Sequence, residues 1–174
     1  MAADIPRLLE PALLQSILDS TAGDNNLIIV DLCSDALYRQ KHVPGAVHLQ
    51  PGVLMAGTAP YPGKLPTIEQ LTNIIQYLGI DADNHVVIYD DEGGGWAGRF
   101  AWTLDLLGYQ NWSYLNGGIV AWIREGFATE SQANQATASN TSVSIANPTA
   151  LVCTDDIISR LGNSDFAVWD ARSP

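Results

Sequence analysis

The chain has 174 residues, of which 47% are hydrophobic and 16% are charged. This composition supplies enough apolar material for a folded core and excludes a disordered or fibrous chain. The length predicts one complete domain and about forty further residues. With 8 Lys and Arg against 19 Asp and Glu, the formal net charge of −11 argues against binding to nucleic acid or to an anionic membrane surface.

The first half of the chain alternates predicted helices and strands. Pro11 to Ser20 carries an apolar stripe and predicts a helix, and the apolar run from Leu27 to Leu32 predicts a buried strand. A second helix is predicted from Thr67 to Gly79, with a capping box at its start and a left-handed stop at its end. The β-branched run from His85 to Tyr89 does not alternate, which predicts a central parallel strand.

The same alternation continues after this strand. The pattern predicts a helix from Ala97 to Leu107, a short strand from Trp112 to Leu115 and a helix from Ile119 to Glu125. Strands and helices that alternate with short turns indicate βαβ units. We therefore predict an α/β fold in residues 1–126, with a doubly wound parallel sheet flanked by helices.

The amino-acid composition changes after this domain. Phe127 to Asn147 has no Lys or Arg and is rich in small and polar residues, so a linker is predicted over residues 127–148. Residues 149–174 then repeat the helix-then-strand pattern of the opening, and Asp31 and Asp170 close equivalent apolar runs. We predict that these residues are the truncated beginning of a second copy of the domain.

Residues 149–174 are too few to form a hydrophobic core by themselves. We expect their apolar residues to dock on the first domain, to exchange between chains or to be disordered. The residues concerned are Ile157, Ile158, Leu161 and Val168.

The chain shows no sign of a membrane segment or a metal site. No apolar run approaches the roughly 20 residues of a spanning helix, and the first residues lack the features of a signal peptide.

Cys33 and Cys153 are too few for a disulfide framework and lack metal-ligand spacing. We predict a cytoplasmic protein without metal or cofactor. For both cysteines a structural thiol is favoured over a reactive one, and Asp31 and Asp35 raise the pKa expected for Cys33.

The segment from Tyr89 to Arg99 (YDDEGGGWAGR) joins a buried strand to a helix, where α/β proteins bind ligands. A Gly-rich turn into a helix N-terminus suits an anion, but Asp90, Asp91 and Glu92 would repel one. Two alternatives stay open. The three carboxylates could hold Mg²⁺. The acids could instead cap the helix, with a tight turn provided by Gly93, Gly94 and Gly95.

Other candidate residues have simpler interpretations. His42 lies beside a turn predicted at Pro44-Gly45, and a backbone hydrogen bond is favoured there over acid–base catalysis. Trp96 and Trp102 are predicted to pack in the core or between domains, and Trp96, within the loop, is better placed to contact a partner.

Four segments together resemble the rhodanese family of sulfurtransferases. Asp31 followed by YRQKHVPGAVH resembles the early signature of this family. VVIYDDEGGGWAGRFAW and YLNGGIVAW resemble segments of the first domain in tandem-domain rhodaneses and mercaptopyruvate sulfurtransferases. The tail WDARSP resembles the first signature of their second, catalytic domain. The resemblance covers nearly the whole chain.

The resemblance implies a reaction and different roles for the two domains of the protein. In this family a cysteine at the start of the strand-to-helix loop takes a sulfane sulfur from thiosulfate or 3-mercaptopyruvate as a persulfide, and passes it to cyanide or a thiol. Asp90 holds that position here, and a carboxylate cannot form a persulfide. The resemblance therefore implies that the chain is the non-catalytic first domain of a tandem sulfurtransferase, inactive alone and partnered by the C-terminal catalytic domain of the same polypeptide. A stand-alone, catalytically silent binding or regulatory module is the alternative.

Two further residues take their interpretation from the resemblance. Arg99 matches an arginine placed near the cleft between the domains, where it can bind a small anionic sulfur donor, or it pairs with the acids of the loop. Cys33 stands where the family usually has an arginine, which removes an ion pair with Asp31.

Overall fold

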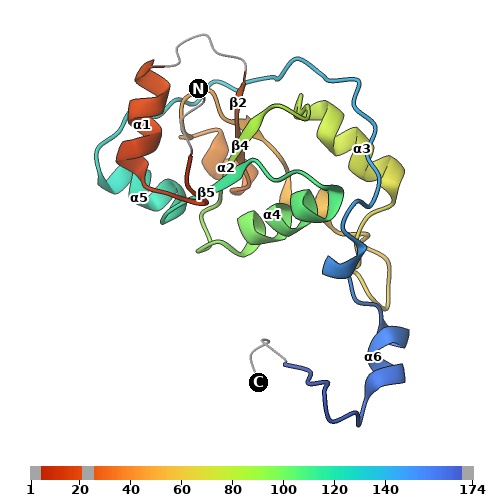
Figure 1. Cartoon of the computed structure of the whole chain (residues 1–174). Coiled ribbons are helices and arrows are strands. Elements are labelled where there is room, and N and C mark those ends of the chain that lie inside the picture. The colour runs from red at the N-terminus through yellow and green to blue at the C-terminus, as the bar shows by residue number, and fades with distance from the viewer. Residues whose placement is uncertain (1–4, 21–25, 170–174) are drawn as a thin grey trace.

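The computed structural model describes residues 5–20 and 26–169. All the strands run parallel in one sheet, in the order β1-β5-β4-β2-β3 (Figure 1). Their bounds are β1 (Leu8–Leu9), β2 (Leu27–Asp31), β3 (Val47–His48), β4 (His85–Tyr89) and β5 (Trp112–Leu115). The predicted parallel sheet is confirmed.

Helices cover both faces of the sheet. The helices of the domain are α1 (Pro11–Ser20), α2 (Asp35–Tyr38), α3 (Ile68–Tyr77), α4 (Gly95–Leu107) and α5 (Gly118–Arg124). The tail contains α6 (Thr154–Arg160), and short 3-10 turns lie at Pro51–Leu54 and Pro148–Ala150. Figure 1 shows α3 and α4 on one side of the sheet and α1 and α5 on the other. None of the helices in the described ranges is long and apolar enough to cross a membrane.

The central strands consist mainly of apolar residues because both of their faces are buried. Val30 and Ile88 face the core beneath α3 and α4, whereas Ile29 and Val87 face the core beneath α1 and α5. The capping box predicted at Thr67 is present, because its hydroxyl accepts from the Gln70 amide and the Gln70 side chain accepts from the Thr67 amide.

The sheet winds in two directions from its centre. The chain leaves β2 toward the neighbouring β3, and it leaves β4 toward β5 on the opposite side. Asp31 pairs with Tyr89 in the register, so the carboxyl ends of β2 and β4 lie side by side at this reversal. A crevice at such a point is where open α/β sheets bind ligands.

The segment predicted as a linker lies along the domain and is held to it. We call residues 127–147 the strap. Its apolar side chains Ala136, Val143 and Ile145 pack against the core on the α3 and α4 side. The amides of Ala146 and Asn147 both donate to the carbonyl of Leu106. The strap therefore connects the domain to the tail and also covers part of the domain.

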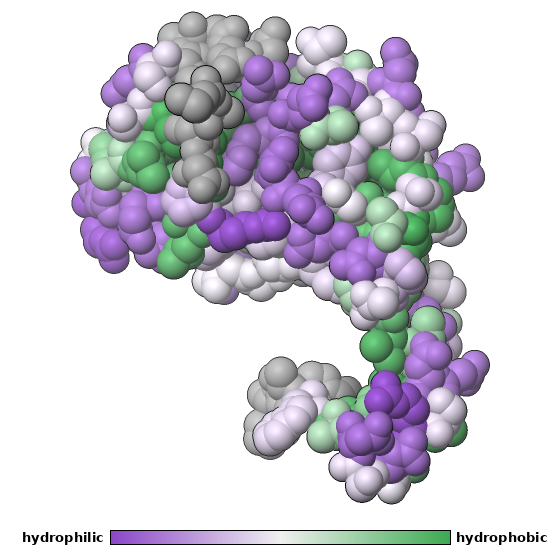
Figure 2. All heavy atoms as spheres, viewed as in Figure 1, coloured by the Kyte–Doolittle hydropathy of each residue, from purple (hydrophilic) through white to green (hydrophobic). Residues whose placement is uncertain are grey.

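In the described part of the tail, only the first residues contact the domain, where Ala150 accepts from the Trp102 indole and residues 151–155 lie beside α4. Figure 2 shows most of α6 and residues 161–169 standing apart from the domain, joined by a narrow connection. Ile158, Leu161 and Val168 are 62%, 61% and 56% exposed. The helix expected in the tail is present as α6. The strand expected to end at Asp170 is absent from residues 166–169, since no neighbouring strand offers them hydrogen bonds, and Asp170 itself lies outside the described residues.

Candidate functional site

The loop after β4 is built around the carboxylate of Asp90, which is 1% exposed. Its Oδ1 accepts hydrogen bonds from the amides of Glu92 at 3.2 Å and Gly94 at 2.8 Å. Its Oδ2 accepts from the amides of Trp96 and Ala97, each at 3.0 Å. Asp90 therefore supplies, from within the chain, the anion that a Gly-rich turn at a helix N-terminus binds.

Two glycines give the loop this shape. Gly93 and Gly94 have φ of +81° and +99°, a region that residues with a side chain rarely adopt. Gly94 also packs against the Tyr114 hydroxyl, since a Cβ on Gly94 would lie 3.2 Å from that oxygen. The turn directs successive amides toward one point, and that point is the Asp90 carboxylate.

The structure distinguishes between the two predicted interpretations of this loop. Asp90 caps the first turn of α4, as the capping interpretation expects, whereas Asp91 and Glu92 make no side-chain hydrogen bond to that turn in the described ranges. The Mg²⁺ interpretation is not supported, because no group of three or more His, Cys, Asp or Glu side chains that could hold a metal occurs among residues 5–20 and 26–169.

Next to the loop, at the end of β2, lies a second buried carboxylate. Asp31 Oδ1 accepts from the Cys33 amide at 2.8 Å, and Asp31 Oδ2 has no partner at hydrogen-bonding geometry within the described part of the chain. Burial raises the pKa of Asp31, and the nearby Tyr89 hydroxyl lowers it in part. Asp31 thus accepts a hydrogen bond from the backbone of Cys33. At the position of Cys33 the family that the sequence resembles usually has an arginine, which would form an ion pair with this carboxylate.

Cys33 is held as a neutral thiol. Burial raises the pKa of Cys33, and the negative charges of Asp31 and Asp91 raise it further. The residue is 0% exposed, so neither solvent nor a substrate reaches its sulfur in this conformation. These observations agree with the interpretation of Cys33 as a structural thiol.

His42 makes the predicted backbone hydrogen bond and lies against the strap. It is buried, and its Nδ1 lies 2.6 Å from the carbonyl oxygen of Tyr38. Its ring stacks on Tyr38, with the centroids 3.9 Å apart, and its Nε2 lies 3.5 Å from Glu130 of the strap. His42 therefore joins the strap to the domain.

Arg99 does not pair with the loop acids. Its Nε and Nη2 donate to the carbonyl of Leu54 at 3.2 and 3.0 Å, and Nη2 also donates to the carbonyl of Gly63 at 2.9 Å. No ion pair joins it to Asp90, Asp91 or Glu92 in the part of the chain that the structure describes, so that alternative is wrong. The guanidinium reaches main-chain acceptors on the neighbouring loop instead.

The two tryptophans of this region have different roles. Trp96 is half-buried and packs against the core on the α3 and α4 side. Trp102 donates its indole N–H to the carbonyl of Ala150 at 2.9 Å, and so fixes the end of the connection to the tail. Core packing is the observed role of Trp96, and its contact with a partner stays a prediction.

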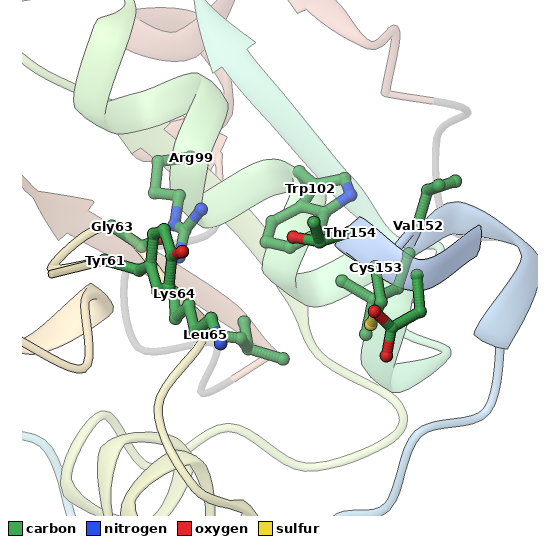
Figure 3. Close-up of a pocket in the computed structure, with 11 residues that line it drawn as sticks. Tyr61, Gly63, Lys64, Leu65, Arg99, Trp102, Val152, Cys153 and Thr154 are labelled. Carbon is green, nitrogen blue, oxygen red and sulfur yellow. The ribbon is translucent and has the colours of Figure 1, made fainter. Parts of the chain in front are cut away.

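A groove of about 920 Å³ opens beside Arg99 and Trp102 (Figure 3). Lys64, Tyr61 and Cys153 also line it. The sequence pattern does not reveal this groove, because Tyr61 and Lys64 belong to a Pro- and Gly-containing loop without periodic pattern. Only the fold brings that loop next to residues 151–155.

The chain belongs to the family of rhodanese-like domains, whose sequence model matches residues 14–125. It is 42% identical over 173 residues to a thiosulfate sulfurtransferase of Azotobacter vinelandii, and 40% identical over 179 residues to one of Pseudomonas aeruginosa. Each alignment covers 99% of this chain and 62% of the relative, so the chain spans less than two thirds of their length. A crystal structure of a 3-mercaptopyruvate sulfotransferase from Escherichia coli superposes with a TM-score of 0.76 and 25% identity, covering 88% of this chain and 61% of that one.

Proposed function

We propose that this chain is the non-catalytic first domain of a tandem sulfurtransferase. The whole protein would move a sulfane sulfur from thiosulfate or 3-mercaptopyruvate to a thiophilic acceptor such as cyanide or a thiol. The observation that carries the proposal is the Asp90 carboxylate, which accepts four backbone amides of the loop. The names of the relatives support the reaction class.

The chemistry of the loop explains why we expect no activity from these residues alone. In a catalytic copy, amides of such a loop would stabilise the negative charge of a cysteine persulfide. Here the amides already bind an oxygen anion that cannot accept sulfur. Cys33 is buried and neutral, and Cys153 is exposed on the groove near α6, while the four loop amides bind Asp90 and neither thiol.

The catalytic partner in this proposal is a second rhodanese-like domain of the same polypeptide. The greater length of the relatives supports it. The exposed apolar side chains of the tail support it as well, because Ile158, Leu161 and Val168 would gain a core from the rest of such a domain. We further propose a cytoplasmic location, supported by only two cysteines, both unpaired.

Arg99 keeps a limited role in this proposal. Its Nη1 makes no hydrogen bond within the described residues and is available to a small anionic sulfur donor held between the two domains. The other nitrogens of the guanidinium are already used by main-chain carbonyls.

The decisive experiment compares this chain with the polypeptide translated from the complete open reading frame. With thiosulfate and cyanide, we expect this chain to form no more thiocyanate than its Cys33→Ser, Cys153→Ser double variant. We expect the complete polypeptide to be active and to lose activity when the cysteine that opens its second loop is replaced by Ser. Thiocyanate formation by this chain that disappears on Cys33→Ser or Cys153→Ser would overturn the proposal. A reading frame that ends at Pro174 would favour the stand-alone binding module instead.

A further inference from the structure

The groove beside Arg99 is separate from the Asp90 loop. One wall is the loop that carries Tyr61 and Lys64, the floor includes Arg99 and Trp102 of α4, and the other wall is formed by residues 151–155 (Figure 3). None of residues 90–95 lines it. The indole of Trp102 bonds to Ala150, which fixes the distance between the two walls.

The groove holds two cations in a strongly acidic chain. Lys64 and Arg99 are two of only 8 basic residues in a chain of net charge −11. Neither forms an ion pair within the described ranges: the Lys64 ammonium lies 4.9 Å from the Tyr61 ring centroid, and Arg99 bonds to carbonyls and lies 4.8 Å from the Trp102 ring. Asp155 brings a single carboxylate to the rim. Arg99 Nη1 and Lys64 Nζ are the donors left for a ligand.

The remaining walls are apolar and partly aromatic. The Trp102 indole and the Tyr61 ring offer flat surfaces, and Leu65, Leu151 and Val152 add aliphatic ones. A ligand that matches these walls needs an apolar body as well as a negative end.

We propose that this groove binds an amphipathic organic anion, in which a carboxylate or sulfonate is attached to an aromatic or branched aliphatic body. Lys64 and Arg99 Nη1 hold the anionic group, and Trp102 packs against the body. The volume of about 920 Å³ is at the upper end of the range of small-molecule sites. An ion as small as thiosulfate would leave most of it empty. This site goes beyond the proposed sulfurtransferase function. It shares Arg99 Nη1 with the sulfur donor of that proposal, so the two ligands would compete for this nitrogen.

The test uses two fluorescent probes of similar shape. Anilinonaphthalene sulfonate carries the required anion, and phenylnaphthylamine lacks it. We expect saturable binding of the sulfonate at one site per chain, with energy transfer from tryptophan. Lys64→Glu should weaken the sulfonate about tenfold while changing the affinity for the neutral probe less than about twofold. Lys41→Glu makes the same change of charge outside the groove and should change neither affinity by more than about twofold.

A third variant tests the apolar wall. Trp102→Leu should weaken both probes, and circular dichroism verifies that this variant is folded. If it is unfolded, Val152→Asp tests the opposite wall with the same expectation of weaker binding. Equal losses in Lys64→Glu and Lys41→Glu, or equal affinity of the original chain for the two probes, would overturn the proposal. The sulfurtransferase assay is not a readout here, so the two proposals fail separately.

Discussion

A Cβ atom on Gly118 would lie 2.2 Å from the carbonyl oxygen of Asp90. Gly118 also has a φ of +57°, and the next amide, that of Ile119, donates to the same carbonyl at 3.2 Å. The first turn of α5 thus packs directly against the backbone where the Asp90 loop begins. Any side chain at this position would separate the helix from the end of β4.

The first prediction follows from this contact. Gly118→Ala should lower the free energy of unfolding by more than about 2 kcal/mol, because it combines a left-handed backbone with a clash against main-chain atoms. Gly45→Ala is the matched control, since Gly45 has a φ of +78° but no atom within 4 Å of its Cβ position. It should cost about 1 kcal/mol. Urea unfolding measures both, and equal losses would show that the contact is unimportant.

The second prediction concerns the Asp90 carboxylate. Asp90→Ala leaves four loop amides without their acceptor and should lower the free energy of unfolding by about 2–4 kcal/mol. Asp91→Ala removes a neighbouring carboxylate that accepts no hydrogen bond in the described part of the chain, and should cost about 0.5 kcal/mol or less. A loss for Asp90→Ala as small as that for Asp91→Ala would contradict the structure of the loop.

The third prediction is a dependence on pH. Burial raises the pKa of Asp31, so the folded chain holds this proton more tightly than the unfolded chain. The resulting stability is fully present below the unfolded pKa of about 4 and is lost as the pH rises through the higher folded pKa. Asp31→Asn removes this dependence. The difference in free energy of unfolding between the original chain and the variant should therefore shift in favour of the variant as the pH rises from about 4 toward 7. A constant difference over this interval would show that Asp31 titrates normally.

The fourth prediction separates the two thiols. Iodoacetamide should label Cys153 of the folded chain and leave Cys33 unlabelled, because Cys33 is buried and its raised pKa keeps it protonated. In denaturant both should react. Mass spectrometry of tryptic peptides assigns the sites, and Cys153→Ser serves as the control that leaves Cys33 as the sole target. Rapid labelling of Cys33 in the folded variant would show that the end of β2 opens readily.

The fifth prediction concerns the attachment of the strap. The Asn134 amide group donates to Glu130 at 2.5 Å and to the carbonyl of Ala46 at 3.2 Å, and the Asn134 backbone amide donates to the Tyr38 hydroxyl at 3.0 Å. Asn134→Ala should cost about 1–2 kcal/mol and speed hydrogen exchange in the strap. Gln132→Ala, at an exposed position of the same segment, should change neither quantity. Unchanged exchange in Asn134→Ala would mean that the strap is held elsewhere.

The parts of the fold with dense local signals could be predicted from the sequence. β2 and β4 are mainly apolar runs that are buried on both faces. Thr67 and Gln70 have the residue types and the spacing of a capping box, which marks the start of α3. The two-residue strands β1 and β3 could not be found, because their pairing depends on distant neighbours. Periodicity over so few residues carries no information.

The site was predicted in position but only partly in its interactions. Sequence order places Asp90 at the start of the loop, and the acids there were expected to repel an anion. The spacing does not show that the Asp90 side chain turns back and is itself the bound anion. The partners of Arg99, the carbonyls of Leu54 and Gly63, could not be predicted either. Every residue has a main-chain carbonyl, so the sequence does not indicate which of them accepts a hydrogen bond from a given side chain.

The strap has a practical consequence for anyone who wishes to express this domain by itself. Truncation at Gly126, the boundary that composition suggests, would strip Ala136, Val143 and Ile145 from the core and leave fresh apolar surface open to water. A fragment that continues to Ala150 would retain these side chains and the Trp102 hydrogen bond. We therefore expect the smallest fragment that folds by itself to extend about two dozen residues beyond α5, the last helix that covers the sheet.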